Sequence, residues 1–268
     1  MQNTYEEIVR NVYRNGYTRI PISLSRQELE SSAALFERTL KTVPLGRRAS
    51  LQGKLNGNPR EFVGFKDISF PDQAPAPFFH YTKGFEDGFP TEGMEKFLKS
   101  ASHVYDRCVE SFTSVLATLE PGFGELKSRF FSDSQAARFF LMFICFPEQQ
   151  GNHFPAHYDH FAITIGLHQS AGRLHIGLND KDAKPVEYTD NQAVLYFGQA
   201  FEGISTDMPL GRHFVAASGE NSQARTSIIF LATTLDSPTV ANRENHQTAQ
   251  RLRNYTQEGL ERLLALNR

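Results

Sequence analysis

The second half of the chain contains a series of short, β-rich segments, and this feature constrains the fold most strongly. The series opens with a continuous apolar stretch, Arg138–Pro147, which predicts a strand buried on both faces. Shorter segments follow, separated by Gly, Asn, Asp or Pro: residues 161–168, 173–178, 185–188, 193–197, 212–217 and 225–232. Several short strands at this spacing are typical of a sandwich or barrel, with a jelly roll as one option.

Helices are predicted before this β-rich region. The motifs Thr4–Glu7 and Ser25–Glu28 both match a capping box, so they predict helices over residues 4–15 and 26–42. A short strand, Arg19–Ile22, is expected between the two helices, and its proline favours a position at a sheet edge.

Two further helices frame the β-rich region. Apolar residues at helical spacing predict a long helix over residues 92–119, ended by Pro121 and Gly122, and a closing helix over residues 247–266. The predicted fold class is therefore α+β with a mainly β core, in one domain over residues 1–268. Its parts are a helical N-terminal region (1–125), a jelly-roll core (126–235) and a C-terminal helix (236–268).

Residues 44–90 show little periodicity, with Gly, Pro and Phe recurring throughout. A loop of this length in a compact domain is often functional. One interpretation is a lid over residues 60–90 that covers an active site. The other is an irregular shell whose aromatic side chains attach it to the core.

Composition excludes several classes of protein. The formal net charge is −2 over 268 residues, so there is no basic surface typical of nucleic-acid binding. Two cysteines, Cys108 and Cys145, are too few for a disulfide framework or a thiolate metal site. The N-terminus is polar, and no apolar stretch reaches membrane-spanning length. We expect a soluble, cytoplasmic protein without a nucleic-acid or membrane partner, and its oligomeric state stays open.

A candidate metal site begins at His157-Tyr158-Asp159. In an extended segment, positions i and i+2 point to the same side, so His157 and Asp159 can bind one ion. His213, the single histidine between residues 180 and 240, is the candidate third ligand. Two imidazoles and one carboxylate leave coordination positions open, an arrangement that suits non-haem Fe(II) and O2. An ordinary exposed His-Asp pair is the alternative interpretation.

Arg225 and Ser227 form a second candidate site. They lie at i and i+2 in a predicted strand, 12 positions after His213. A guanidinium binds both oxygens of a carboxylate, and each charge-assisted hydrogen bond contributes about 1.5–3 kcal/mol. An arginine that only bridges two strands is the structural alternative.

Together these motifs resemble the isopenicillin N synthase-like group of Fe(II)- and 2-oxoglutarate-dependent oxygenases. That pattern is His-x-Asp, a distant His and Arg-x-Ser, and here it reads His157-Tyr158-Asp159, His213 and Arg225-Thr226-Ser227. The segments Ala171–Ile176 and Asp190–Gly198 look like two strands of the family. The similarity covers about residues 138–232.

The resemblance implies a double-stranded β-helix fold and an enzyme. His157, Asp159 and His213 would bind Fe(II), and Arg225 and Ser227 would hold the far carboxylate of 2-oxoglutarate. O2 would be the other co-substrate, and decarboxylation would yield succinate. The expected reaction is oxidation of an unactivated C–H bond of a small molecule, by hydroxylation, desaturation or cyclisation. Natural-product biosynthesis is the expected setting.

The sequence departs from the family near the co-substrate. Ile144 and Phe146 stand where Asn and Tyr often precede the proline, Gln199 stands where Asp is common, and Phe214 stands where Arg often follows the distal His. These departures keep two alternatives open. One is an Fe(II) oxidase of the same superfamily that does not use 2-oxoglutarate, and the other is a non-catalytic metal- or carboxylate-binding module.

Other residues are candidates by position alone. Phe161, Gln199 and Phe201 are expected to face the substrate. A further set of histidines, interpreted as surface, cavity-lining or core residues rather than metal ligands, comprises His153, His160, His168 and His175.

Overall fold

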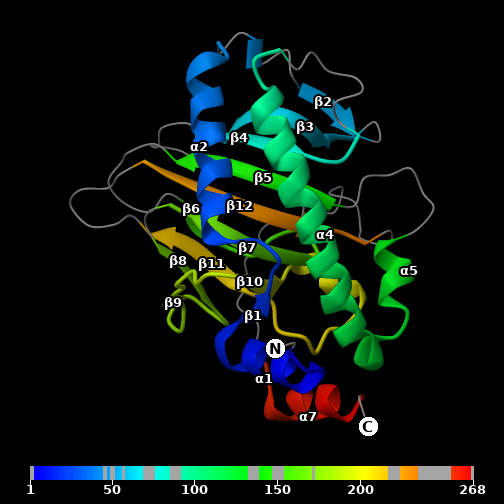
Figure 1. The fold of residues 1–268 in the computed structure, drawn as a ribbon. Helices are drawn as coiled ribbons and strands as arrows, with labels where there is room; N and C mark the ends of the chain where they lie inside the picture. Colours follow the sequence, from blue (N-terminus) through cyan, green and yellow to red (C-terminus); the bar gives the residue numbers. More distant parts are fainter. Residues whose placement is uncertain are drawn as a thin grey trace.

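Two antiparallel sheets face each other at the centre of the protein (Figure 1). The computed structural model describes residues 3–44, 47–48, 52–55, 58–68, 76–84, 92–131, 139–146, 154–170, 173–216, 224–234 and 255–266. The larger sheet contains β1 (Thr18–Pro21), β2 (Gln52–Leu55), β3 (Asn58–Ile68), β4 (Ala76–Tyr81), β5 (Phe139–Phe146), β7 (Ile163–Gln169), β10 (Gln192–Phe197) and β12 (Arg225–Ala232). The smaller sheet contains β6 (Phe154–His157), β8 (Arg173–Gly177), β9 (Lys184–Pro185) and β11 (Arg212–Ala216).

Among the described residues, the strand order is β1-β10-β7-β12-β5-β4-β3-β2 in the larger sheet and β6-β11-β8-β9 in the smaller one. The apolar stretch that opens the β-rich region forms β5, which lies between β4 and β12 and is largely buried, as predicted. β1 lies at the edge of its sheet, so the position expected from Pro21 is confirmed. The strand expected over residues 185–188 is reduced to the two residues of β9.

A bulge interrupts the pairing of β7 with β12. Ile229 pairs with Gly166, whereas Ile228 pairs with His168, so Leu167 is an extra residue on β7. An extra residue changes the face to which the following side chains point. His168 therefore points to the same side as Ile228, toward the helices, and Gln169 shares the opposite side with Ser227.

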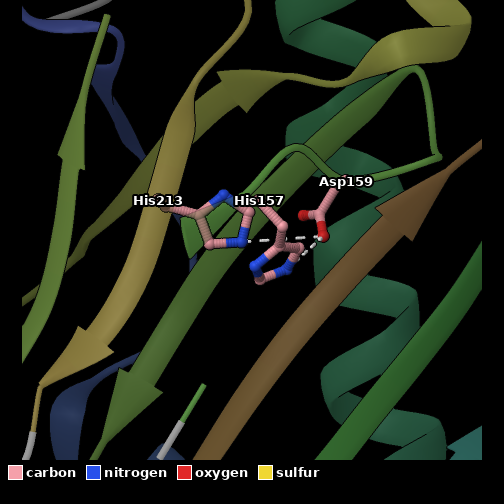
Figure 2. Close-up of side chains that lie close together, drawn as sticks. All are labelled: His157, Asp159 and His213. Carbon is pink, nitrogen blue, oxygen red and sulfur yellow. Dashed lines mark ion pairs between the residues drawn. The ribbon is translucent and has the colours of Figure 1, made fainter. Parts of the chain in front are cut away.

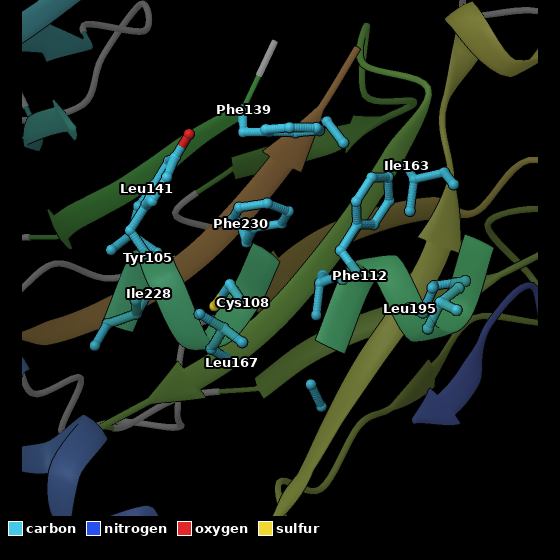
Figure 3. Packing of buried hydrophobic residues seen from close by; sticks show 14 of the residues in the cluster. Tyr105, Cys108, Phe112, Phe139, Leu141, Ile163, Leu167, Leu195, Ile228 and Phe230 are labelled. Atoms are coloured by element: carbon cyan, nitrogen blue, oxygen red, sulfur yellow. The ribbon is translucent and has the colours of Figure 1, made fainter. Parts of the chain in front are cut away.

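The helices α2 (Arg26–Thr42) and α4 (Glu95–Phe123) lie across the outer face of the larger sheet (Figure 1). Figure 3 shows side chains of α4 packed against those of the strands. Phe112 is fully buried, with its ring centroid 5.1 Å, 5.4 Å and 5.8 Å from those of Phe130, Phe139 and Phe230. Burial of one such ring contributes about 1.5–3 kcal/mol, so this interface is a major source of stability.

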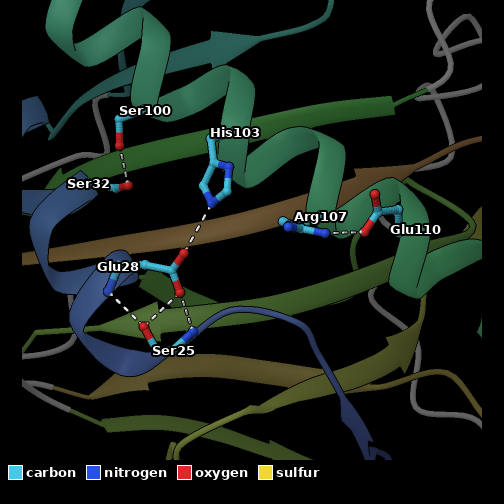
Figure 4. Close-up of polar contacts among 7 residues, drawn as sticks. All are labelled: Ser25, Glu28, Ser32, Ser100, His103, Arg107 and Glu110. Carbon is cyan, nitrogen blue, oxygen red and sulfur yellow. Dashed lines mark hydrogen bonds and ion pairs between the residues drawn. The ribbon is translucent and has the colours of Figure 1, made fainter.

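Polar contacts connect α2 to α4 (Figure 4). Ser25 and Glu28 form the predicted capping box at the start of α2. The same Glu28 carboxylate lies 3.1 Å from Nε2 of His103 on α4, and Ser32 is hydrogen-bonded to Ser100 at 2.5 Å. The capping residue therefore also fixes the position of α2 against its neighbour.

The long helix ends later than the sequence predicts. Pro121 lies inside the last turn of α4, and Gly124, with φ of 63°, is the capping residue. A proline removes one backbone hydrogen bond but leaves the next turn possible, and the Gly124 N–H still bonds the Glu120 carbonyl at 2.8 Å. The prediction that Pro121 and Gly122 stop the helix is therefore wrong by one turn.

The prediction of an irregular loop over residues 44–90 is also wrong for the described part of that region. β3 pairs with β4, and β4 pairs with β5, so both strands extend the larger sheet. Phe79 is fully buried beneath α4, with its ring centroid 5.1 Å from that of Phe97. A strand fixed on both edges cannot open as a lid. Residues 69–75 and 85–91, which include the rest of the expected lid, lie outside the described residues.

The two ends of the chain lie together (Figure 1). The helix α1 (Tyr5–Asn15) begins with the predicted capping box and ends at Gly16, which has φ of 79°. Its Tyr5 hydroxyl donates a hydrogen bond of 2.9 Å to the Leu263 carbonyl of α7 (Gln257–Ala265). The part of the predicted closing helix over residues 247–254 lies outside the described residues. None of the described helices is long and apolar enough to cross a membrane.

Candidate metal centre

His157, Asp159 and His213 lie together between the two sheets (Figure 2). His157 is the last residue of β6, and its direct partner across the strand pair is His213 of β11. Asp159 follows in the turn after β6, so it approaches the histidines from the side of the larger sheet. Strand pairing thus unites two residues that are 56 positions apart in sequence.

The distances suit a single ion. Nε2 of His157 and Nε2 of His213 each lie 3.7 Å from Oδ1 of Asp159. One ligand atom from each residue lies within 4.8 Å of the others. Two ligand atoms bound to one first-row metal at about 2.0–2.2 Å stand about 3–4.4 Å apart, a range that includes both 3.7 Å separations. The three residues therefore fit a divalent metal with two imidazole ligands and one carboxylate ligand.

Backbone carbonyls orient both rings. Nδ1 of His157 lies 2.8 Å from the Pro155 carbonyl, and Nδ1 of His213 lies 3.1 Å from the Gly211 carbonyl. A carbonyl can only accept, so each Nδ1 carries the proton and each Nε2 keeps its lone pair. Both lone pairs are then available to a metal. Burial, with His157 close by, lowers the pKa of His213 to about 4, which also favours the neutral ring.

The Asp159 carboxylate is held in its ionised form. Thr164 of β7 donates a hydrogen bond of 2.7 Å to its Oδ2, which leaves Oδ1 directed at the histidines. Burial raises the pKa of Asp159, but His213 and His157 outweigh this effect, so that pKa lies well below its usual range. Burial and Asp159 together raise the pKa of Tyr196 well above its usual range.

Sequence reasoning did not identify Thr164 and Tyr196. The Tyr196 ring lies 4.8 Å from the ring of His213, so it forms a wall of the metal centre. Thr164 is the partner of Tyr196 in the pairing of β7 with β10. Each is a polar residue inside an otherwise apolar strand. Such a residue can be assigned to the interior only when the neighbouring strand is known.

A close backbone contact fixes the loop that carries Asp159 and Phe161, here called the metal loop. A Cβ atom on Gly198 would stand 2.1 Å from the Phe161 carbonyl oxygen and 2.7 Å from that of Asp159. The helical turn η2 (Gln199–Gly203) follows, and its Gln199 N–H bonds the Asp159 carbonyl at 2.8 Å. Glycine is therefore required where this turn meets the loop that carries the carboxylate ligand.

The expected substrate-facing residues are not equivalent. Oε1 of Gln199 lies 2.9 Å from Nδ1 of His160, so its side chain braces the metal loop. Phe161 is partly exposed, and its ring lies 5.9 Å from that of Phe140 on β5. Phe201 is fully buried in the main core, 5.4 Å from Phe123 of α4. A substrate contact does not follow from that position of Phe201.

Among the described residues, the group that could share one ion contains no further histidine. His168 is buried on the helix-facing side, where burial lowers its pKa. His175 stacks on Phe214 with ring centroids 4.7 Å apart. This contact gives a packing role to Phe214, which stands where Arg often follows the distal His. His153 lies outside the described residues.

Arg225 and Ser227 are buried side by side on β12, with 2% and 4% of their surface exposed. Nη2 of Arg225 donates a hydrogen bond of 3.0 Å to the Ser227 hydroxyl, and the guanidinium lies 4.5 Å from the ring of Phe146. Its Nε and Nη1 have no partner among the described residues. Burial lowers the pKa of Arg225 to about 9. A buried cation with unsatisfied donors is costly, and a bound carboxylate would satisfy it.

Comparison with solved structures places this arrangement in a known fold. A full-length Neurospora crassa protein in complex with alpha-KG matches with a TM-score of 0.67 and 16% identity, over 86% of this chain and 78% of that one. A Caulobacter crescentus protein assigned to the 2OG-Fe(II) oxygenase family gives 0.66 and 16%, over 97% and 93%. The dioxygenase for auxin oxidation from rice gives 0.63 and 14%, over 85% and 78%.

The chain folds as a double-stranded β-helix. The prediction of fold class is confirmed, since the two facing sheets and the covering helices match these structures over most of their length. No protein-family model matches the sequence, and no curated protein matches it at a significant level. The likeness is therefore one of fold.

Proposed function

We propose that this protein is a non-haem Fe(II)- and 2-oxoglutarate-dependent oxygenase. The observation that carries the proposal is the pairing of two sites inside one β-helix. His157, Asp159 and His213 present three metal ligands, and Arg225 presents a buried guanidinium with two nitrogens that have no partner among the described residues. A keto acid with a second carboxylate carries one group suited to each site.

The iron would be held by Nε2 of His157, Nε2 of His213 and Oδ1 of Asp159. Three protein ligands leave the remaining positions for the co-substrate and O2. Fe(II) and 2-oxoglutarate, when bound, supply the O2 activation that oxidises a C–H bond while 2-oxoglutarate is converted to succinate and CO2. The carbonyls of Pro155 and Gly211 would keep both imidazoles in the ligating tautomer.

The distal carboxylate of 2-oxoglutarate would bind the Arg225 guanidinium and the Ser227 hydroxyl. Phe146 lies against the guanidinium, so it excludes water from that face and holds the plane of the donors. This co-substrate fits the solved neighbours, because the Neurospora crassa protein was crystallised with alpha-KG and a dioxygenase for auxin oxidation from Arabidopsis thaliana forms a 2-oxoglutarate complex.

The substrate in this proposal is a small molecule. Thymine and 5-formyluracil are bound by the Neurospora crassa neighbour. Here Phe161 and Phe140 offer an aromatic wall near Asp159, suited to a partly apolar substrate. Membership of the isopenicillin N synthase-like subgroup, a natural-product substrate, a cytoplasmic location and a single catalytic domain over residues 1–268 belong to the same proposal.

A second candidate is an Fe(II) oxidase that does not use 2-oxoglutarate. Phe146 favours it, because phenylalanine lacks the hydroxyl that the related enzymes often place beside the co-substrate. The unsatisfied nitrogens of Arg225 favour 2-oxoglutarate. A non-catalytic binding module is a weaker alternative, because it would not need three ligands with open positions.

Measuring O2 consumption and succinate formation by the Fe(II)-loaded protein, with and without 2-oxoglutarate, separates these functions. The proposal expects O2 uptake and succinate only with 2-oxoglutarate, including slow uncoupled turnover before the substrate is known. Uptake without 2-oxoglutarate would indicate the oxidase. Absence of uptake and of 2-oxoglutarate binding to the iron-loaded protein would indicate the binding module.

A further inference from the structure

The carboxylate site proposed at Arg225 leaves acceptor positions of the ligand for a donor outside the Arg-x-Ser motif. One nitrogen of Arg225 bonds Ser227, and the part of the chain that the structure describes offers no partner to the other two. A carboxylate offers about four acceptor positions, more than Arg225 and Ser227 occupy. In the family that the sequence resembles, a Tyr hydroxyl often helps here, but this chain has Phe146 at that place.

Tyr188 brings a hydroxyl to the same interior from another direction. It lies between β9 and β10, and its ring packs against the small cluster of apolar residues between the two sheets. A Cβ atom on Gly166 would stand 2.6 Å from the Tyr188 hydroxyl oxygen. The hydroxyl therefore lies against the backbone of β7, in space that any other residue at position 166 would fill.

The register of β7 places this hydroxyl between the two sites. Thr164, which bonds Asp159, and Gly166 lie at i and i+2, so they face the same interior. Past the bulge at Leu167, Gln169 faces the interior again and is paired with Ser227. Tyr188 thus approaches β7 at Gly166, which lies between Thr164 at the metal centre and Gln169 beside Ser227.

Electrostatics agree with this placement. Burial raises the pKa of Tyr188 to about 12, and the positive charge of Arg225 opposes that rise. The two side chains are therefore within electrostatic reach of each other. At neutral pH the phenol keeps its proton, so it can donate a hydrogen bond to an anion.

We propose that the Tyr188 hydroxyl binds the distal carboxylate of 2-oxoglutarate together with Arg225 and Ser227, and replaces the hydroxyl that Phe146 lacks. This inference rests on the proposed function. Tyr188 would be a binding residue that selects a keto acid with a second carboxylate. Gly166 would be required because it leaves space for the hydroxyl.

The test compares two ligands in three proteins. Anaerobic Fe(II)-loaded wild type, Tyr188→Phe and Tyr17→Phe are titrated with 2-oxoglutarate and with 2-oxopentanoate, which has the same chain length but no distal carboxylate. Binding is followed by the metal-to-ligand charge-transfer absorbance. Tyr17 is the matched control, because it packs against the same apolar cluster as Tyr188.

We expect Tyr188→Phe to raise the Kd for 2-oxoglutarate about 10- to 100-fold, as for a lost hydrogen bond to a charged group. The Kd for 2-oxopentanoate should stay within about 3-fold of wild type, since that ligand cannot use the hydroxyl. Tyr17→Phe should leave both constants unchanged.

Any result that differs from these expectations contradicts either the role of Tyr188 or the proposed function. Unchanged 2-oxoglutarate affinity in Tyr188→Phe, with tight binding by wild type, removes Tyr188 from the site but leaves the proposed function. Equal weakening for both ligands means that Tyr188 only shapes the pocket, and also overturns its carboxylate role. Failure of wild type to bind 2-oxoglutarate overturns the proposed function itself.

Gly166→Ala supplies an independent second measurement. The added Cβ would displace the hydroxyl, so this variant should also weaken 2-oxoglutarate binding in the wild-type background. In the Tyr188→Phe background, Gly166→Ala should weaken 2-oxoglutarate binding by a smaller factor, because no hydroxyl remains to be displaced. Equal penalties in both backgrounds would contradict the proposed contact.

Discussion

At the residue scale, a substitution at His213 tests whether this residue is a metal ligand. His213→Ala should bind less than one iron per molecule after anaerobic loading, because two of three protein ligands do not hold Fe(II) tightly. His175→Ala is the matched control, since His175 lies on the neighbouring strand and stacks on Phe214. Metal analysis and circular dichroism check the outcome. Full iron content in folded His213→Ala would remove it from the ligand set.

Arg225 is the second residue whose role can be measured directly. Arg225→Ala should raise the Kd for 2-oxoglutarate about 30- to 1000-fold, equivalent to about 2–4 kcal/mol, while iron still binds. Arg225→Lys should also weaken binding, because an ammonium lacks the planar pair of donors. Ser227→Ala should raise the Kd for 2-oxoglutarate by a smaller factor than Arg225→Ala does.

The control for the Arg225 series is Arg107→Ala, because Arg107 is a partly exposed arginine on α4 that pairs with Glu110. It should leave the charge-transfer titration unchanged. An arginine that only bridged strands would lower the unfolding midpoint of Arg225→Ala without a specific loss of 2-oxoglutarate affinity. Unaltered affinity in the folded variant would favour the oxidase.

Single residues were predictable where their chemistry is rare and their spacing is short. The pair His157 and Asp159, with His213 as the single distal candidate, was found from types and positions alone. Thr164 was missed because a threonine in an apolar strand has many ordinary uses. Phe201 was assigned to the substrate, yet it packs on α4, because the side of a helical turn that faces the core depends on tertiary contacts.

At the scale of elements, Glu28 couples a helix cap to a helix–helix contact. Hydrogen bonds from Ser25, with His103 nearby, lower the pKa of Glu28 from its ordinary 4.5 to about 2. A lowered pKa in the folded state means that ionised Glu28 stabilises the fold above about pH 4.5, and this contribution disappears as pH falls toward 2.

Glu28→Gln tests that coupling, because glutamine keeps a capping group but not the charge. It should be less stable than wild type by less than about 1 kcal/mol at pH 7, since the pair is partly exposed. The difference should shrink as the pH falls from about 5 toward 2 in urea unfolding. A difference that is constant over this range would show that the charge has no role.

Elements were predictable where caps or periodicity are local. Both capping boxes and the apolar strand β5 were identified correctly. β3 and β4 were missed because their sequence mixes Gly, Pro and Phe without clear alternation. They are defined as strands by the pairing of β4 with β5 and of β3 with β4. The bulge at Leu167 was equally invisible, because it is defined by the partner strand.

At the scale of the whole molecule, the contact between α1 and α7 can be weakened without touching the metal centre. Leu263 is 1% exposed and belongs to the main hydrophobic core. Leu263→Ala should lower the free energy of unfolding by about 2–4 kcal/mol through the cavity that it leaves. Urea unfolding checks this value, with Leu266→Ala as the control because Leu266 is 53% exposed. Equal stability of the two variants would mean that α7 is not part of the cooperative unit.

The bond between Tyr5 and Leu263, 258 residues apart, also sets an order of events during synthesis. Chains grow from the N-terminus at about 5–20 residues per second, so α1 would emerge more than about ten seconds before its partner is made. During that interval the apolar face of α1, which includes Ile8 and Val12, lacks part of its final covering. The nascent chain therefore exposes part of the apolar face of α1 until residue 263 has been synthesised.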